Sequence, residues 1–248
     1  MKEQFVVVIP ARFASTRLPG KPLRKIVGLP MILHTVARAQ QSGADRVYVA
    51  TDDQRISDVC NSAGVDVVMT RDDHQSGSDR LAEVCDELQL DDSVIVVNVQ
   101  GDEPLIAPVV IEQVAKLLMD NIDCEMASLY HLIDDQDDFL DPNVVKVVCD
   151  ARERALYFSR APIPFDRGQA SDAPAPNKTL ALHLARRHIG LYAYRAGFLR
   201  RFVRYAAAPI ERVEVLEQLR ALHHGAHIMM AEAEADSGPG IDTEEDLQ

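Results

Sequence analysis

The chain has 248 residues, of which 47% are apolar and 26% are charged, and its formal net charge is −13. This composition predicts a globular protein, and the acidic charge argues against a nucleic acid or an anionic membrane surface as the main partner. The N-terminus lacks the long apolar stretch of a signal peptide, and no run reaches the ~18 residues of a membrane span. The four cysteines form no CxxC pair, so we expect reduced thiols in a cytoplasmic protein.

The first half of the chain alternates strand patterns with helix patterns. Continuous β-branched runs between helices predict an α/β fold with a mostly parallel sheet that is buried on both faces. The expected strands cover residues 4–10, 45–51, 65–70 and 92–100. The expected helices cover residues 30–43, 54–64, 79–90 and 109–121.

The second half is less regular. The expected strands cover residues 124–133, 143–150, 154–159 and 188–195, with no clear helix between the second and the third. Residues 162–178 are rich in Pro, Ala and Asp and predict a loop. Two helices are expected at 198–206 and 209–225, and the second would place Val213 and Leu216 on one apolar stripe.

The loop "ARFASTRLPGKPL", residues 11–23, follows the first expected strand and carries Arg12, Arg17 and Lys21. A P-loop is excluded, because Ser15 stands where that motif needs Gly and a proline follows the lysine. Arg and Lys suit phosphate oxygens, and ligands of open α/β sheets bind beyond the carboxyl ends of the strands. The loop is either a polyphosphate clamp or a solvated basic loop.

Carboxylates follow another expected strand in "NVQGDEP", residues 98–104. Asp102 and Glu103 lie just beyond that strand, where a hard divalent cation such as Mg²⁺ would find oxygen ligands. The alternative is a turn with solvated acids. Asp242, in "GIDTEEDL", offers a second carboxylate just before a capping-box pattern at Thr243.

Other polar positions have a structural reading beside the functional one. Ser76, in "TRDDHQSGSDR", either caps the following helix or contacts a ligand. His188 and Tyr192 share one face of an expected strand across Gly190, which leaves room for a ligand, although a packed histidine is the usual case. Glu217 lies on the acidic face of the expected helix over 209–225, and such a face is usually exposed to solvent.

Nine segments occur along the chain in this order: "ARFASTRLPGKPL", "ATDD", "TRDDHQSGSDR", "VNVQGDEPLI", "NVVKVV", "ALYFSRAPIP", "RHIGLYAYR", "LEQLRAL" and "GIDTEEDL". Together they closely resemble the 3-deoxy-manno-octulosonate cytidylyltransferase family, over nearly the whole chain. The resemblance implies a cytoplasmic, Mg²⁺-dependent homodimer that joins CTP to 3-deoxy-manno-octulosonate (KDO), giving CMP-KDO and pyrophosphate for lipopolysaccharide synthesis. It implies one domain over 1–248, an α/β/α sandwich of the nucleotide-diphospho-sugar transferase type, with a smaller β-rich dimerisation region at about 124–195.

The resemblance also implies roles for individual residues. It places Arg12, Ser15, Arg17 and Lys21 at the CTP phosphates. It places Ser76 and Arg80 near the nucleotide, and Gln100 near the base or the sugar. It makes Asp102 and Asp242 the metal ligands, and Lys21, Arg17 and the two aspartates the catalytic set. It assigns the sugar pocket to Gln100, Arg160, His188, Tyr192, Glu217 and Gln218.

The chain departs from the family pattern near its end, where Glu244 stands in place of the usual Pro. This departure affects the expected fit of the C-terminal segment. Two other functions remain open at this point. One is a related cytidylyltransferase for another acidic sugar, such as an 8-amino variant of KDO or a sialic acid. The other is a nucleotide-binding protein without activity.

Overall fold

The computed structural model describes residues 5–14, 18–167, 180–241 and 243–247. These residues form two compact units. The first unit combines residues 1–120, 191–204 and 234–248, and the second combines residues 121–190 and 205–233. The predicted β-rich region at 124–195 overlaps most of the first segment of the second unit, and the single-domain reading stays a prediction.

The first unit is built on a sheet with the strand order β10-β6-β1-β4-β5. Its strands are β1 (Phe5–Ala11), β4 (Arg46–Thr51), β5 (Asp66–Met69), β6 (Ile95–Asn98) and the part of β10 (Arg186–Arg195) that begins at Leu191. β1 pairs in parallel with both β4 and β6, and β4 pairs in parallel with β5. Only the pairing of β10 with β6 is antiparallel among these neighbours. The predicted α/β fold with a mostly parallel sheet is therefore confirmed.

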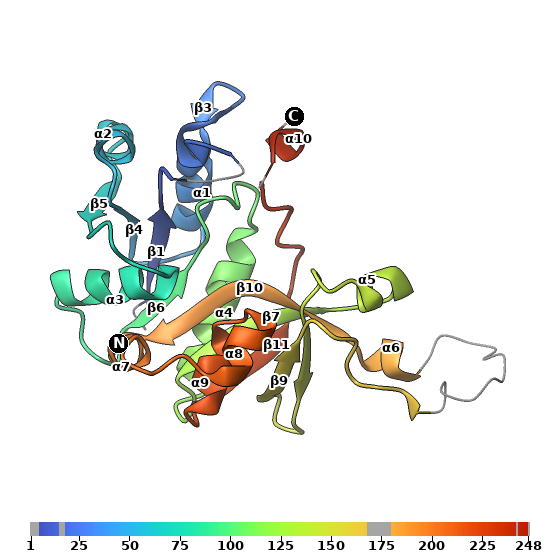
Figure 1. Cartoon of the computed structure of the whole chain (residues 1–248). Helices are drawn as coiled ribbons and strands as arrows, with labels where there is room; N and C mark the ends of the chain where they lie inside the picture. Colours follow the sequence, from blue (N-terminus) through green and yellow to red (C-terminus); the bar gives the residue numbers. More distant parts are fainter. Residues whose placement is uncertain (1–4, 15–17, 168–179, 242, 248) are drawn as a thin grey trace. The chain divides into compact units, whose positions relative to one another are not determined.

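Helices cover both faces of this sheet, and α1 packs on α4 while α3 packs on α7 (Figure 1). The helices are α1 (Met31–Gln40), α2 (Gln54–Ser62), α3 (Gly77–Glu87), α4 (Pro108–Asp120), α7 (Ala196–Phe202) and α10 (Glu244–Leu247). Between β1 and α1 lie the short 3₁₀ helix η1 (Lys21–Leu23) and the hairpin of β2 (Lys25–Ile26) and β3 (Leu29–Pro30). Val7, Val8 and Ile9 are fully buried, because β1 is the central strand and has neighbours on both sides and helices on both faces.

Among its described residues, the second unit contains four whole strands, part of a fifth, and short helices. β7 (Met126–Leu132) lies between β11 (Ile228–Glu232) and the first half of β10, and β8 (Lys146–Cys149) pairs antiparallel with β9 (Ala155–Ser159). The helices are α5 (Gln136–Leu140), α6 (Leu180–Leu184), α8 (Pro209–Glu214) and α9 (Gln218–His223). The direct succession of two strands expected near residue 150 is confirmed. The sequence does not predict α5 or α6. Each helix has five residues, which is too few to show the apolar periodicity of a helix.

The prediction of one continuous helix over 209–225 is wrong, because the structure has two short helices there. The chain leaves the helical conformation at Val215, whose φ of 54° and ψ of 50° lie in the left-handed region, and resumes as α9 at Gln218. The expected apolar stripe is broken at the same place, since Val213 is 84% exposed while Leu216 is buried. Of the predicted loop at 162–178, residues 162–167 are described, and they contain no α-helix or strand.

None of the helices in the described part of the chain has both the length and the apolar composition needed to cross a membrane.

Candidate active site

The strand order of the first unit selects one edge of its sheet. The chain runs outward from β1 to β4 and β5 on one side and places β6 on the other, so the direction of winding reverses at β1. In open α/β sheets such a reversal opens a crevice at the carboxyl ends of the strands, where ligands bind. The loops after β1 and β6 leave the sheet there, side by side (Figure 1). These are the basic loop and the acidic turn that were singled out from the sequence.

Lys21 is held in place by the turn that precedes it. Gly20 has a φ of 66°, a conformation that glycine adopts without strain, and a Cβ at this position would lie 3.1 Å from the Phe13 ring. The Lys21 amide donates to the Leu18 carbonyl at 3.1 Å, and Pro22 suits the first turn of η1. The Lys21 side chain is 11% exposed, so its ammonium group has little freedom.

The Lys21 ammonium group lies 2.5 Å from the Asp102 carboxylate. The two residues are 81 positions apart in the sequence and come from the loops after β1 and β6. The Asp102 carbonyl also accepts from the Ile241 amide at 2.9 Å, which ties the residue before Asp242 to the same turn. The structure thus brings together Lys21 and Asp102. Ser15, Arg17 and Asp242 lie outside the described residues, and their assignments stay predictions.

The acidic turn offers a carboxylate oxygen, the type of ligand that Mg²⁺ takes. A Cβ at Gly101 would lie 3.0 Å from the Pro10 carbonyl, so the turn packs closely on the end of β1. Burial, with the Asp102 charge adding to it, raises the pKa of Glu103 to about 7. No group of three or more His, Cys, Asp or Glu side chains arranged for a metal occurs among the described residues. Mg²⁺ commonly takes one or two carboxylates with substrate phosphates, so Asp102 and a second aspartate fit it.

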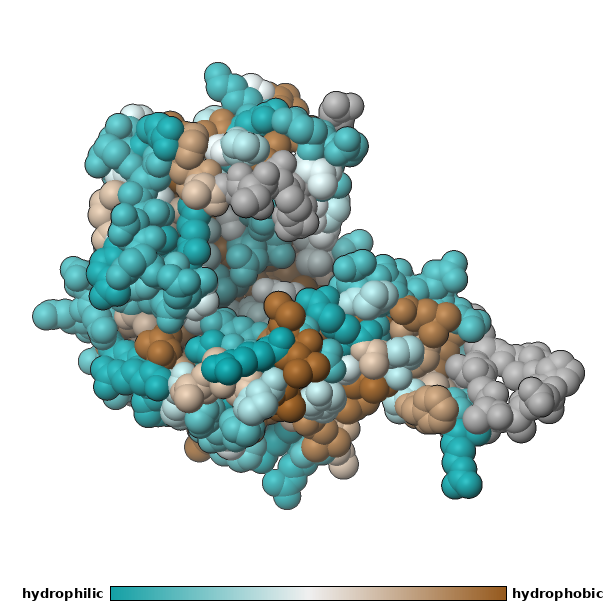
Figure 2. Space-filling model, in the orientation of Figure 1, coloured by the Kyte–Doolittle hydropathy of each residue, from teal (hydrophilic) through white to brown (hydrophobic). Residues whose placement is uncertain are grey.

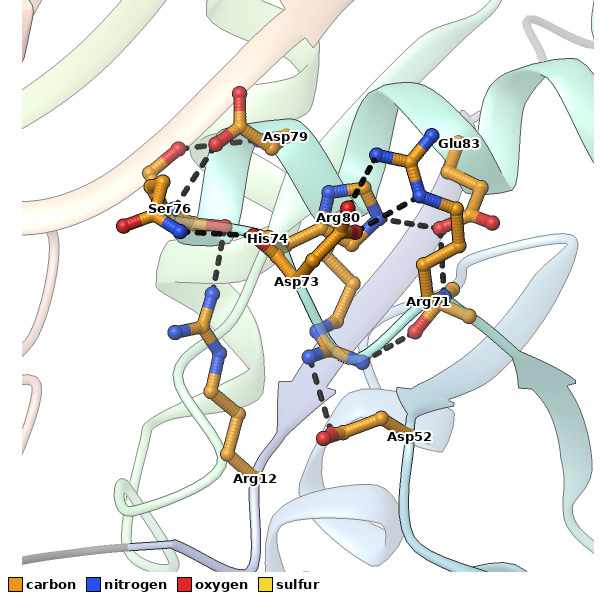
Figure 3. A network of polar contacts seen from close by, with 11 residues as sticks. Arg12, Asp52, Arg71, Asp73, His74, Ser76, Asp79, Arg80 and Glu83 are labelled. Atoms are coloured by element: carbon orange, nitrogen blue, oxygen red, sulfur yellow. Dashed lines mark hydrogen bonds and ion pairs between the residues drawn. The ribbon is translucent and has the colours of Figure 1, made fainter.

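Arg12 and Arg80 gather positive charge beside the same edge. The Arg12 guanidinium donates to the Ser76 carbonyl at 2.9 Å (Figure 3). Arg80 is fully buried, with one Nη 3.0 Å from the Asp52 carboxylate and the other donating to the Thr70 hydroxyl. Burial lowers the pKa of Arg80, and the Asp52 charge opposes this effect. Guanidinium groups at this edge of the sheet suit an anionic ligand.

Ser76 caps α3, which is one of the two roles predicted for it from the sequence. Its hydroxyl accepts from the Asp79 amide at 3.1 Å, and the Asp79 carboxylate accepts from the Ser76 amide at 3.0 Å. This capping box starts α3 two residues earlier than expected. Gln100 lies half-buried directly before the acidic turn. Direct contacts of Ser76, Arg80 and Gln100 with a nucleotide stay predictions.

The predicted sugar-binding residues are divided between the two units. Gln100 and Tyr192 belong to the first, where Tyr192 has its ring centre 5.8 Å from that of Tyr194. The second unit holds Arg160, His188, Glu217 and Gln218. Their shared role in sugar binding stays a prediction.

His188 is neutral in the folded protein. Its Nε2 lies 3.0 Å from the Ser128 hydroxyl, and its ring meets the edge of Phe158 with the ring centres 4.9 Å apart. Burial lowers the pKa of His188 to about 3. A neutral imidazole has one donor and one acceptor nitrogen, so it can accept a hydrogen bond from a polar ligand or donate one to it.

Arg160 is oriented by the main chain around it. Its guanidinium donates to the Glu214 carbonyl at 2.7 Å and to the Pro142 carbonyl at 2.9 Å. Its own carbonyl accepts from the fully buried ammonium of Lys146 at 2.7 Å. Lys146 also donates to the carbonyls of Asp141 and Val144 at 2.8 and 2.5 Å, so all three of its N–H groups are used.

The sequence reasoning missed several residues that hold these groups. Lys146 interrupts an apolar strand pattern, "VVKVV", and a charged residue inside such a run is a signal of a buried partner. Asp52 follows one expected strand and Thr70 ends another, which marks both as residues at the ligand edge. Nothing in the sequence pattern indicates that His74 and Glu83 contact each other.

Comparison with known proteins places this site in context. A family model described as "Cytidylyltransferase" matches residues 6–228. The chain is 56% identical to a 3-deoxy-manno-octulosonate cytidylyltransferase of Verminephrobacter eiseniae, covering 99% of this chain and 93% of the relative. It is 52% identical to a protein of the same name from Pseudoalteromonas translucida, covering 98% of this chain and 95% of the relative.

Solved structures show the same similarity. A structure of CMP:2-keto-3-deoxy-manno-octonic acid synthetase complexed with CTP matches with a TM-score of 0.88 and 42% identity, covering 98% of this chain and 95% of that chain. A cytidylyltransferase from Leptospira borgpetersenii matches with a TM-score of 0.60 and 20% identity, covering 98% and 83%. The second likeness extends to the fold alone.

Proposed function

The chain belongs to the 3-deoxy-manno-octulosonate cytidylyltransferase family, and from this premise we propose that it transfers the cytidylyl group of CTP to KDO and releases pyrophosphate. The observation that carries the proposal is the Lys21–Asp102 pair at the carboxyl edge of the sheet, in a chain 42% identical to a synthetase complexed with CTP. The product, CMP-KDO, would supply lipopolysaccharide synthesis.

The reaction is an in-line displacement at phosphorus. A bond forms between the anomeric oxygen of KDO and the α-phosphorus of CTP, and the bond from that phosphorus to the bridging oxygen of pyrophosphate breaks. The hydroxyl proton passes to water, and the electron pair of the broken bond leaves with pyrophosphate. Such transfers depend mainly on positioning and on neutralising charge. Lys21 and Arg12 bind the phosphate oxygens and offset the charge that develops on the leaving group.

We assign the metal to the acidic turn. Asp102, together with Asp242 as predicted from the resemblance, would hold Mg²⁺. When bound, Mg²⁺ neutralises phosphate charge and lowers the pKa of an attacking hydroxyl group. The Asp102 carboxylate contacts Lys21 in the structure, so binding of metal and triphosphate gives each partner of this pair a new counter-charge.

A pyrophosphate-release assay tests the proposed function. Purified protein is incubated with CTP and Mg²⁺, with and without KDO, and then with EDTA. Release that requires KDO and stops with EDTA supports the proposal. Release with a sialic acid or an 8-amino variant of KDO, and none with KDO, would assign another acidic sugar. CTP binding without release on any sugar would make the protein a nucleotide-binding protein.

We also propose a homodimer and a cytoplasmic location. Leu156, Val213 and Val215, all in the second unit, are 60%, 84% and 74% exposed. Figure 2 shows apolar surface in the region of α8 and β9, and exposed apolar patches commonly mark interfaces. Sedimentation equilibrium should give twice the mass of one chain. A single-chain mass at all concentrations would contradict the dimer.

All four cysteines are free thiols, which supports the proposed location in a reducing compartment.

A further inference from the structure

The loop between β5 and α3 is held by α3 itself. Three residues on the first turns of the helix, Asp79, Arg80 and Glu83, point back toward the loop (Figure 3). Asp79 accepts from the Ser76 amide, and Arg80 donates to the Thr70 hydroxyl. The loop is thereby fixed at its two ends. The third contact, through Glu83, is in its middle and has no role in starting the helix.

Glu83 gathers two donors on one carboxylate oxygen. Its Oε2 accepts from the Arg71 amide at 3.0 Å and contacts Nε2 of His74 (Figure 3). The His74 side chain is 8% exposed and that of Glu83 is 19% exposed. Burial raises the pKa of Glu83, but the hydrogen bonds from His74 and Arg71 outweigh it, so the pKa lies below its ordinary value. Glu83 is therefore an ionised acceptor in a sheltered position, where its hydrogen bonds are strong.

The same loop positions Arg12. Ser76 stands two residues after His74, and its carbonyl accepts from the Arg12 guanidinium at 2.9 Å. The other polar groups of Ser76 are used by the capping box with Asp79. The direction of the Ser76 carbonyl thus depends on how the loop approaches α3, and His74 and Glu83 fix that approach.

We propose that His74 is a positioning residue for CTP, acting through Glu83 and the Ser76 carbonyl on the guanidinium of Arg12. The proposal rests on the proposed function, since it takes Arg12 as a phosphate ligand. His74 does not contact the nucleotide in this account. It fixes a loop whose carbonyl directs a cation, so its loss weakens CTP binding and leaves the affinity for the sugar unchanged.

A double-mutant cycle tests this inference. The dissociation constant of CTP is measured by calorimetry, and KM for CTP and KM for KDO by pyrophosphate release, for wild type, His74→Ala, Arg12→Ala and the double variant. We expect His74→Ala to raise both CTP constants about tenfold, the effect of one charge-assisted hydrogen bond. In the Arg12→Ala background the same change should add nothing, because residues that act in one chain are not additive.

Two further variants separate positioning from general damage. His74→Gln retains a side-chain N–H that reaches Glu83, and we expect it to restore most of the CTP affinity. Asp73→Ala removes an exposed ion pair with Arg71 in the same loop and should leave all three constants unchanged. Thermal unfolding of every variant shows whether a change in affinity follows a loss of folded protein.

The outcomes are distinct. Additive effects of His74→Ala and Arg12→Ala, an equal rise in KM for both substrates, or no rise in the CTP constants would each overturn the inference. Failure of the proposed function is recognised separately, because the wild-type protein would then show no KDO-dependent release of pyrophosphate.

Discussion

Lys21 shows how a single residue acquires its role from its partner. Its ammonium group is sheltered and lies 2.5 Å from Asp102, so the cation is already oriented for the triphosphate that we propose it binds. Preorganised charge is effective in catalysis because it needs no reorganisation when the transition state forms. Arg12 and Arg80 likewise have fixed positions in the structure.

Lys21→Ala should lower kcat by a factor on the order of 10² or more, the effect of removing one preorganised donor in other enzymes. Steady-state pyrophosphate release measures it. Lys25→Ala is the matched control, because Lys25 is an exposed lysine four residues further along. A near wild-type kcat for Lys21→Ala, or equal losses in both variants, would contradict the catalytic assignment.

We expect His188 to make stability depend on pH. Its pKa is about 3 in the folded protein and about 6.5 in the unfolded chain, so only the unfolded chain takes up the proton between these values. The free energy of unfolding should therefore fall as pH drops below about 6.5, by up to about 1.4 kcal/mol per pH unit from this group. Above pH 6.5 the group is neutral in both states and contributes no dependence.

Urea unfolding at pH 7.0 and 5.5 measures this contribution. His188→Asn should reduce the loss of stability between the two pH values, whereas His183→Asn, at an exposed position in α6, should leave it unchanged. The same pH dependence in all three proteins would show that His188 does not remain neutral on folding.

At the scale of elements, the break between α8 and α9 is decided by contacts far along the chain. Glu214, the last residue of α8, accepts from Ser159 and from the Arg160 amide, and its carbonyl accepts from the Arg160 guanidinium. If the helix continued, the Glu214 carbonyl would have to accept from a backbone amide further along the chain. The next residue, Val215, instead adopts a left-handed conformation that is costly for a β-branched side chain.

Val215→Gly should raise the free energy of unfolding by about 1 kcal/mol, because glycine adopts this conformation without strain. Little burial is lost, since Val215 is 74% exposed. Val213→Gly is the control, at an exposed position within α8, and should lower stability by several tenths of a kcal/mol to about 1 kcal/mol. Chemical denaturation of both variants measures these changes in the free energy of unfolding. Destabilisation by Val215→Gly would show that the left-handed residue is not strained.

Lys146 connects three segments of the second unit, as the donor to carbonyls at positions 141, 144 and 160. Lys146→Met retains an apolar stem but leaves these acceptors without their donor. We expect the free energy of unfolding to fall by about 3 kcal/mol, as buried acceptors lose their partners. Lys116→Met, on the exposed face of α4, should change it by less than about 0.5 kcal/mol. Equal effects of the two changes would contradict the structural role of Lys146.

At the scale of the whole molecule, each of the two units brings a part of the predicted machinery. The first contains Arg12, Lys21 and Asp102, the described residues that are predicted to bind phosphate and metal. The second contains four of the residues predicted for the sugar. Strand β10 belongs to both, because Gly190 ends the first segment of the second unit and Leu191 begins the second segment of the first unit.

The amino-acid sequence by itself determined the order of the longer strands and the α-helices over the first 120 residues, the capping box at Thr243, and the two loops that meet at the ligand edge. These features depend on apolar periodicity and on bonds between residues three apart, which are local. Only the tertiary structure decided that Lys21 meets Asp102, that Arg12 is held by the Ser76 carbonyl and that the last long helix is broken at Val215. Each of these depends on contacts between residues far apart in the chain, and no local pattern encodes such a contact.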